Sequence, residues 1–167
     1  MPRIEPEELG RLYREHAPAL RLYVRQWPAG DEDHVQDAFV KLARQSPCPQ
    51  RPLPWLYRVV RNSAWQAGRS WFRRRRRENK ASGCETWFSN LDDVIDGHDA
   101  TRLLGVLSLE QREVVVARIW GGLTFEDVAQ LVGCPLPTVH RRYHAGLIAL
   151  REKIEKRWTP THSAKTT

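Results

Sequence analysis

The chain has 167 residues, a net charge of +7 and an isoelectric point near 9.8. Its 41% apolar residues and seven tryptophans can form one large domain or two small ones of about 70 residues. The charge favours nucleic acid or an anionic membrane surface as partner, although a merely basic soluble protein has the same charge. No stretch approaches the roughly 18 to 20 apolar residues of a membrane span. The N-terminus lacks the features of a secretory signal, so we expect a cytoplasmic protein.

The chain contains three widely spaced cysteines, Cys48, Cys84 and Cys134. They form no CxxC or HxxxC pair, so reduced thiols are expected, and the sequence predicts neither a metal site nor a cofactor.

In the first third of the chain, apolar residues recur at the spacing of an α-helix. One helix is expected between Glu7 and Trp27, with a kink or a fresh start at Pro18. A second is expected from Asp33 to Gln45. Its apolar face should enter a core and consists of Val35, Ala38, Phe39 and Leu42. A second face groups Asp33, Gln36, Asp37 and Val40.

A third helix is predicted to begin near Pro54, after a proline-rich loop over 46–52. It ends in five consecutive arginines, Arg73 to Arg77. One side interleaves basic, polar and aromatic residues, namely Arg58, Arg61, Asn62, Trp65 and Arg69. Such a side can bind the phosphates of a nucleic-acid strand through its basic residues and can stack bases on its aromatic residue. Two alternatives remain open: the basic run can be a solvated tail, and Trp65 can be a core residue.

An acidic stretch with no Lys or Arg separates two helical regions and predicts a flexible, extended linker. The sequence therefore predicts an all-α protein with a helical domain over 1–80, the linker over 81–101 and a second domain over 102–158. The polar tail over 159–167 is expected to be disordered.

The second domain carries a helix-turn-helix pattern. Ser108 and Thr124 are expected helix N-caps, each with a capping-box partner three residues on. Ala129, Gly133 and Val139 then supply the small contact residue, the left-handed turn and the buried apolar residue of the motif. The exposed positions of its second helix would read the major groove and are Thr138, His140, Arg141, Arg142 and His144. A helical hairpin with merely solvated charges is the alternative.

The order of four sequence blocks resembles the extracytoplasmic-function (ECF) group of the sigma-70 family of RNA polymerase sigma factors. The blocks are LYREHAPAL (12–20), DHVQDAFVKL (33–42), WLYRVVRN (55–62) and LSLEQREV (107–114), the last leading into the helix-turn-helix. The resemblance covers about residues 9–156. It implies a region 2 domain for polymerase binding and the minus-10 element, and a region 4 domain for the minus-35 element.

The resemblance also implies roles for individual residues. Asp33, Gln36 and Asp37 would contact the clamp of core RNA polymerase, whereas Phe39 would be core; an ordinary solvated acidic face is the alternative. Asn62 would lie near a flipped-out base of the melted strand, and an anti-sigma factor is a possible partner. The chain departs from the family at His140, where lysine is usual, and at Ala145, where a basic residue is common.

Three other functions compete with that of a sigma factor. A conventional helix-turn-helix repressor or activator would bind its operator without polymerase and would leave the polar face of the second helix unexplained. An enzyme would need a catalytic constellation, and none is evident in the sequence, so we expect no catalytic residue and no small-molecule substrate. A lone basic cluster also binds membranes only weakly.

Overall fold

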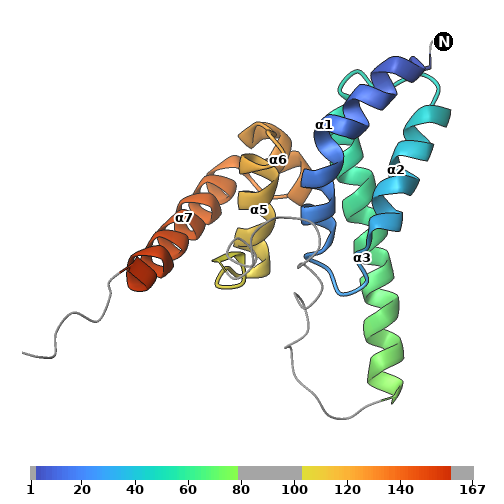
Figure 1. Ribbon diagram of the computed structural model, residues 1–167. Helices are drawn as coiled ribbons and strands as arrows, with labels where there is room; N and C mark the ends of the chain where they lie inside the picture. The colour runs from blue at the N-terminus through green and yellow to red at the C-terminus, as the bar shows by residue number, and fades with distance from the viewer. Residues whose placement is uncertain (1–2, 79–102, 159–167) are drawn as a thin grey trace, which may run out of the picture.

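The structure, a computed structural model, describes residues 3–78 and 103–158 (Figure 1). Its labelled helices are α1 (Pro6–Val24), α2 (Glu32–Arg44), α3 (Pro52–Glu78), α5 (Leu109–Ile119), α6 (Phe125–Val132) and α7 (Leu136–Trp158). No strand occurs in the described ranges, which confirms the all-α prediction. The predicted linker and tail, and Cys84, lie outside the described residues. Within those residues, no helix combines the length and the apolar character that a bilayer crossing requires.

Helices α1, α2 and α3 pack against one another through their apolar faces. Phe39 is buried in this core, as predicted. Of the two alternatives predicted at Pro18, the fresh start is wrong, because α1 runs through this residue as one helix; the kink stays a prediction. Pro18 is exposed, so water can bond the carbonyl that the proline leaves without its usual donor.

A histidine joins the start of α2 to α3. Its ring nitrogens lie 2.7 Å from the hydroxyl of Ser63 and 2.9 Å from the carbonyl oxygen of Ala29. These contacts of His34 fix the loop that precedes α2 against α3. One turn earlier, the Asp31 side chain accepts a hydrogen bond from the backbone N–H of Asp33 and caps α2.

The second half of the described chain forms the predicted helix-turn-helix. Both capping boxes are present, with Ser108 paired to Gln111 and Thr124 paired to Asp127. Gly133 ends α6 with φ of 69°, a left-handed conformation that L side chains rarely adopt. The turn between α6 and α7 therefore depends on this glycine, as the sequence predicted.

The two halves are not separate bodies in the described residues. Helix α5 lies beside α1, and α6 contacts α3, so that one continuous hydrophobic core joins both halves (Figure 1). Tyr57 of α3 approaches Gly121 so closely that a Cβ atom added there would lie 2.7 Å from the tyrosine hydroxyl. The absence of a side chain at Gly121 thus permits the contact. The boundaries of the two domains remain a prediction.

Candidate nucleic-acid interface

Helix α3 presents one exposed stripe that contains most of the predicted strand-binding residues. The stripe follows helical spacing and consists of Arg58, Asn62, Trp65 and Arg69. Trp65 is 49% exposed, so it is a surface residue and not part of the core. The Arg69 guanidinium carbon lies 4.9 Å from the centre of the Trp65 ring. This cation–π contact holds a flat aromatic surface beside a positive charge, an arrangement that can stack a base and contact its phosphate.

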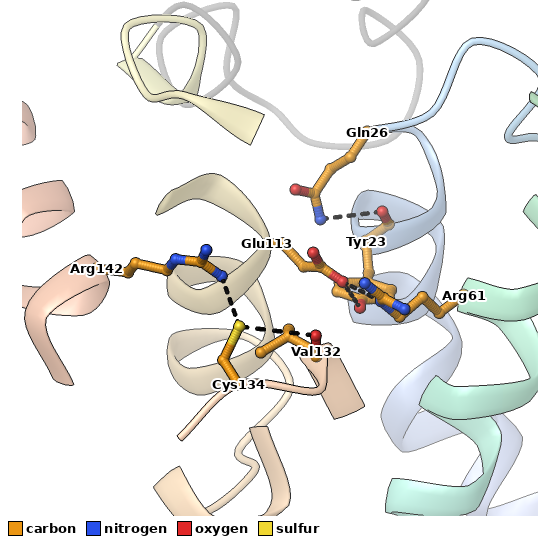
Figure 2. Close-up of polar contacts among 7 residues, drawn as sticks. All are labelled: Tyr23, Gln26, Arg61, Glu113, Val132, Cys134 and Arg142. Carbon is orange, nitrogen blue, oxygen red and sulfur yellow. Dashed lines mark hydrogen bonds and ion pairs between the residues drawn. The ribbon is translucent and has the colours of Figure 1, made fainter. Parts of the chain in front are cut away.

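Arg61 lies apart from that stripe. Its Nε donates a hydrogen bond to Glu113 of α5, and the Tyr23 hydroxyl of α1 donates to the same carboxylate oxygen at 2.8 Å (Figure 2). The Glu113 side chain is only 9% exposed. The structure therefore places a predicted DNA-binding arginine in a contact between the two halves of the chain.

The surroundings of Glu113 raise the pKa of two side chains that donate to it, Tyr23 and Arg61. Burial, followed by the nearby Glu113 carboxylate, raises the pKa of the Tyr23 phenol well above its ordinary value. Burial opposes the charge of Arg61, but the hydrogen bond and the charge of Glu113 outweigh it and raise the pKa of the guanidinium. Both side chains therefore remain hydrogen-bond donors to the carboxylate at neutral pH.

A second ion pair joins the halves. Arg51, in the loop before α3, contacts both carboxylate oxygens of Asp127, with Nη2 2.7 Å from Oδ2. Asp127 is buried in the capping box of α6, whereas the Arg51 side chain is 62% exposed. Burial favours the neutral acid, yet the hydrogen bonds from Arg51 and Thr124 prevail and lower the pKa of Asp127.

The predicted polymerase-contacting residues share a surface of α2. Asp33, Gln36 and Asp37 are all exposed, and Val40 on the same side is 45% exposed. A polar surface with one apolar side chain is suited to a protein contact. The structure thus leaves this surface accessible, and its partner remains a prediction.

The predicted DNA-reading residues of α7 differ in how far they are exposed to solvent. Arg141 and His144 are exposed, whereas Thr138 and His140 are half-buried. The His140 ring lies 4.2 Å from the ring of Phe125 between centroids. This contact holds His140 against α6.

Arg142 is held against the body of the domain rather than extended into solvent. It pairs with Glu110 of α5 at 3.0 Å. It also donates to the Cys134 sulfur at 3.1 Å (Figure 2). The Cys134 thiol in turn lies 3.9 Å from the carbonyl oxygen of Val132. Of the five α7 positions predicted to be exposed, only Arg141 and His144 are exposed. The prediction is wrong for Thr138, His140 and Arg142, which are half-buried; the Arg142 side chain is 22% exposed.

Sequence reasoning missed the residues that join the halves, Arg51, Glu113 and Asp127, together with the role of His34. Asp127 was recognised only as a capping residue. No local signal identifies the contacts of Arg51, Glu113 and Asp127 between the halves, because the partners are separated by 52 to 90 residues, and His34 and Ser63 are 29 residues apart. Within residues 3–78 and 103–158, no group of three His, Cys, Asp or Glu side chains is placed to hold a metal ion.

The sequence is similar to known sigma factors in the half that carries the helix-turn-helix. Residues 98–150 match the family model of sigma-70, region 4. A curated relative, the RNA polymerase sigma-E factor of Streptomyces avermitilis, is 36% identical over 73 residues. That alignment covers 41% of this chain and 41% of the relative, so the chain spans less than half of the relative's length.

Two solved structures share the fold over both halves. The sigma factor RpoE from Bartonella quintana, in complex with the anti-sigma factor NepR, has a TM-score of 0.65 at 22% identity. The match covers 89% of this chain and 98% of that one. CnrH in complex with the cytosolic domain of CnrY has a TM-score of 0.56 at 23% identity, covering 91% and 90%. The region 4 match and the curated relative thus make part of the chain similar to sigma-70 factors, and the two solved structures share its helical fold over both halves.

Proposed function

We propose that this chain is a sigma factor that directs core RNA polymerase to promoters through minus-10 and minus-35 elements. One observation carries the proposal: a single chain combines an exposed cation–aromatic stripe on α3 with a helix-turn-helix on α6 and α7. The first feature suits a separated strand and the second suits duplex DNA. A protein that opens promoters must contact both forms.

On α3, the stripe would follow the non-template strand. Arg58 and Arg69 would contact phosphates, and Trp65 would stack on an unpaired base. Asn62 would contact the flipped-out base, whose extrusion costs a few kcal/mol that stacking and charge must offset.

On α7, Arg141 and His144 would contact the upstream element most directly, because they are the exposed members of the predicted set. Thr138 and His140 lie at the N-terminal end of the helix, which is the end that reaches base edges in this motif. Arg142 would act differently, by fixing α7 against α5 through Glu110.

The partners follow from the same surfaces. The exposed side of α2 with Asp33, Gln36 and Asp37 would bind core polymerase. An anti-sigma factor is a further expected partner, since one structural relative is solved in such a complex. Sigma factors are in general non-enzymatic DNA-binding regulators; for this chain we propose no catalytic residue, no cofactor and a cytoplasmic location.

The test is reconstitution of the full chain with core polymerase on a library of random promoter sequences. Selective initiation from a two-part motif supports the proposal. The competing function, a conventional repressor or activator, predicts specific duplex binding by the isolated chain with no change in initiation by core polymerase. That result would overturn the sigma assignment.

A further inference from the structure

Two histidines lie one helical turn apart on α7. His140 and His144 have ring centroids 6.5 Å apart and ring planes only 19° from parallel. His144 is exposed, whereas His140 is half-buried against Phe125. Because residues four apart share one side of a helix, both rings belong to the side of α7 that the proposed function turns toward duplex DNA.

These two rings differ from the other histidines of the described chain in their surroundings. His16 and His34 each have a carboxylate oxygen nearby, at 3.8 Å and 3.9 Å. Within residues 3–78 and 103–158, neither His140 nor His144 forms an ion pair or a hydrogen bond, and their ring contacts are with aromatic side chains and with each other. A protonated ring at either position would therefore lack an anionic partner in the described part of the fold.

Helices α5, α6 and α7 meet around the pair. Their titratable and charged side chains that adjoin the rings, by contact or in sequence, are Glu110, Arg118, Glu126, Asp127, Arg141, Arg142 and Tyr143. Asp127 is held by Arg51 and Glu110 by Arg142, and the exposed Glu126 forms no ion pair with either described ring. Since Arg118 and Arg141 add positive charge, the anion that would stabilise two imidazolium cations must come from a partner.

We propose that His140 and His144 bind the phosphate backbone of the upstream promoter duplex as imidazolium cations, so that recognition of this element takes up protons. The inference rests on the proposed function, because it takes α7 to be the reading helix. Imidazole is the side chain that changes its charge between about pH 5 and 8. Because phosphate favours the charged ring, protonation and duplex binding strengthen each other by the same factor. The chain therefore binds its upstream element more tightly as the pH falls.

The packing of His140 allows this change of charge without moving the ring. Its centroid lies 4.2 Å from that of Phe125, and the face of an aromatic ring attracts cations. The Arg118 guanidinium carbon already lies 4.8 Å from the centre of the same Phe125 ring. His140 can thus stay in place in either protonation state, and the pH alters the charge on this side of α7 rather than the position of the helix.

The test measures binding of the full chain to a fluorescent mixed-sequence DNA duplex at about pH 6 and about pH 8. Wild type should bind about tenfold more tightly at the lower pH. The double variant His140→Gln, His144→Gln is neutral at both positions and should bind weakly at either pH. The double variant His140→Lys, His144→Lys keeps both charges and should bind tightly at either pH. His16→Gln is the matched control, because it removes a histidine of α1 and should leave the pH dependence unchanged.

The salt dependence of the same binding separates a phosphate contact from a merely structural role. In wild type, the slope of log affinity against log salt concentration should be steeper at the lower pH by about 1 to 2, one for each added phosphate contact. In both double variants the slope should not depend on pH. If the double variants fail to fold, His144→Gln and His144→Lys test the same point, because His144 is exposed, with about half the change in slope.

Equal pH dependence in wild type and the glutamine variant would overturn the inference, and so would wild-type binding that does not change with pH. Neither result touches the proposed function, which is measured by promoter selection with core polymerase at a single pH. In that reconstituted system, the ratio of initiation by wild type to initiation by the lysine variant should fall as the pH rises, because the ratio cancels the response of the polymerase itself. A constant ratio would also overturn the inference.

Discussion

The Tyr57 side chain of α3 lies against the backbone of Gly121 at the end of α5, in a space that admits no further atom. A Cβ at residue 121 would lie 2.7 Å from the tyrosine hydroxyl and 2.4 Å from the Ala117 carbonyl oxygen. This contact joins the half that carries the exposed α3 stripe to the half that carries the helix-turn-helix. Because this contact is so close, a substitution at Gly121 can test how the two halves are arranged.

Gly121→Ala should destabilise the packed chain, because either the backbone or the Tyr57 ring must move to admit the methyl group. Overpacking of this kind costs about 1 to 3 kcal/mol. Urea denaturation of both proteins measures the difference. Gly10→Ala is the control: it lies within α1 and its added Cβ would approach only the end of the Arg14 side chain, at 3.4 Å. That change should raise stability by about 0.5 to 1 kcal/mol. Equal effects of the two substitutions would contradict the close contact.

Asp127 should make the stability of the chain sensitive to acid. Its pKa in the folded chain is lowered, so the unfolded state binds more protons as the pH falls toward the ordinary value of 3.8. The stabilisation is therefore complete well above pH 4 and is lost as the pH falls through the folded-state pKa. Since Arg51 is largely exposed, the contribution is at most about 2 kcal/mol.

The measurement is the free energy of unfolding between pH 7 and pH 3 for wild type and Asp127→Asn. The variant should be less stable at pH 7 and should approach wild type in acid. Glu155→Gln serves as a control, because its pair with Arg151 is exposed on α7 and contributes about 0.3 to 0.5 kcal/mol. Parallel curves for wild type and Asp127→Asn would show that the carboxylate is not coupled to folding.

Arg141→Ala should weaken use of the upstream promoter element. The side chain is exposed on α7, and loss of a bidentate base contact costs about 1 to 3 kcal/mol of discrimination. Abortive-initiation assays on promoters with and without a matched upstream element measure this loss. Arg151→Ala removes the same charge about three turns further along the same helix and should have little effect. If both substitutions lower initiation equally, Arg141 contributes only general charge.

Asp37→Lys should reduce binding to core polymerase, because it reverses the charge at the centre of the exposed side of α2. We expect about a tenfold higher dissociation constant, equivalent to about 1.4 kcal/mol. Fluorescence anisotropy of labelled chain titrated with core polymerase gives the value. Glu15→Lys, an equal reversal on the exposed surface of α1, should leave binding unchanged. An unaltered dissociation constant for Asp37→Lys would remove α2 from the proposed interface.

Much of the fold could be predicted because its signals are local. Capping boxes join residues three apart, and the left-handed turn is a property of Gly133 alone. The exposed spacing of Arg58, Asn62 and Arg69 likewise follows from the helical period. Pro18 shows the limit of local reasoning: whether a proline interrupts a helix depends on whether its surroundings satisfy the freed carbonyl.

Local signals in the sequence predicted the helices, the helix-turn-helix and the exposed positions of Arg58, Asn62 and Arg69. The packed helices were needed to show that Trp65 faces solvent, that Arg142 is anchored by Glu110, and that Arg61 meets Glu113. The physical reason is distance along the chain. Residues within one or two turns are brought together by the helix itself, whereas a contact across 52 residues forms only when whole helices have packed.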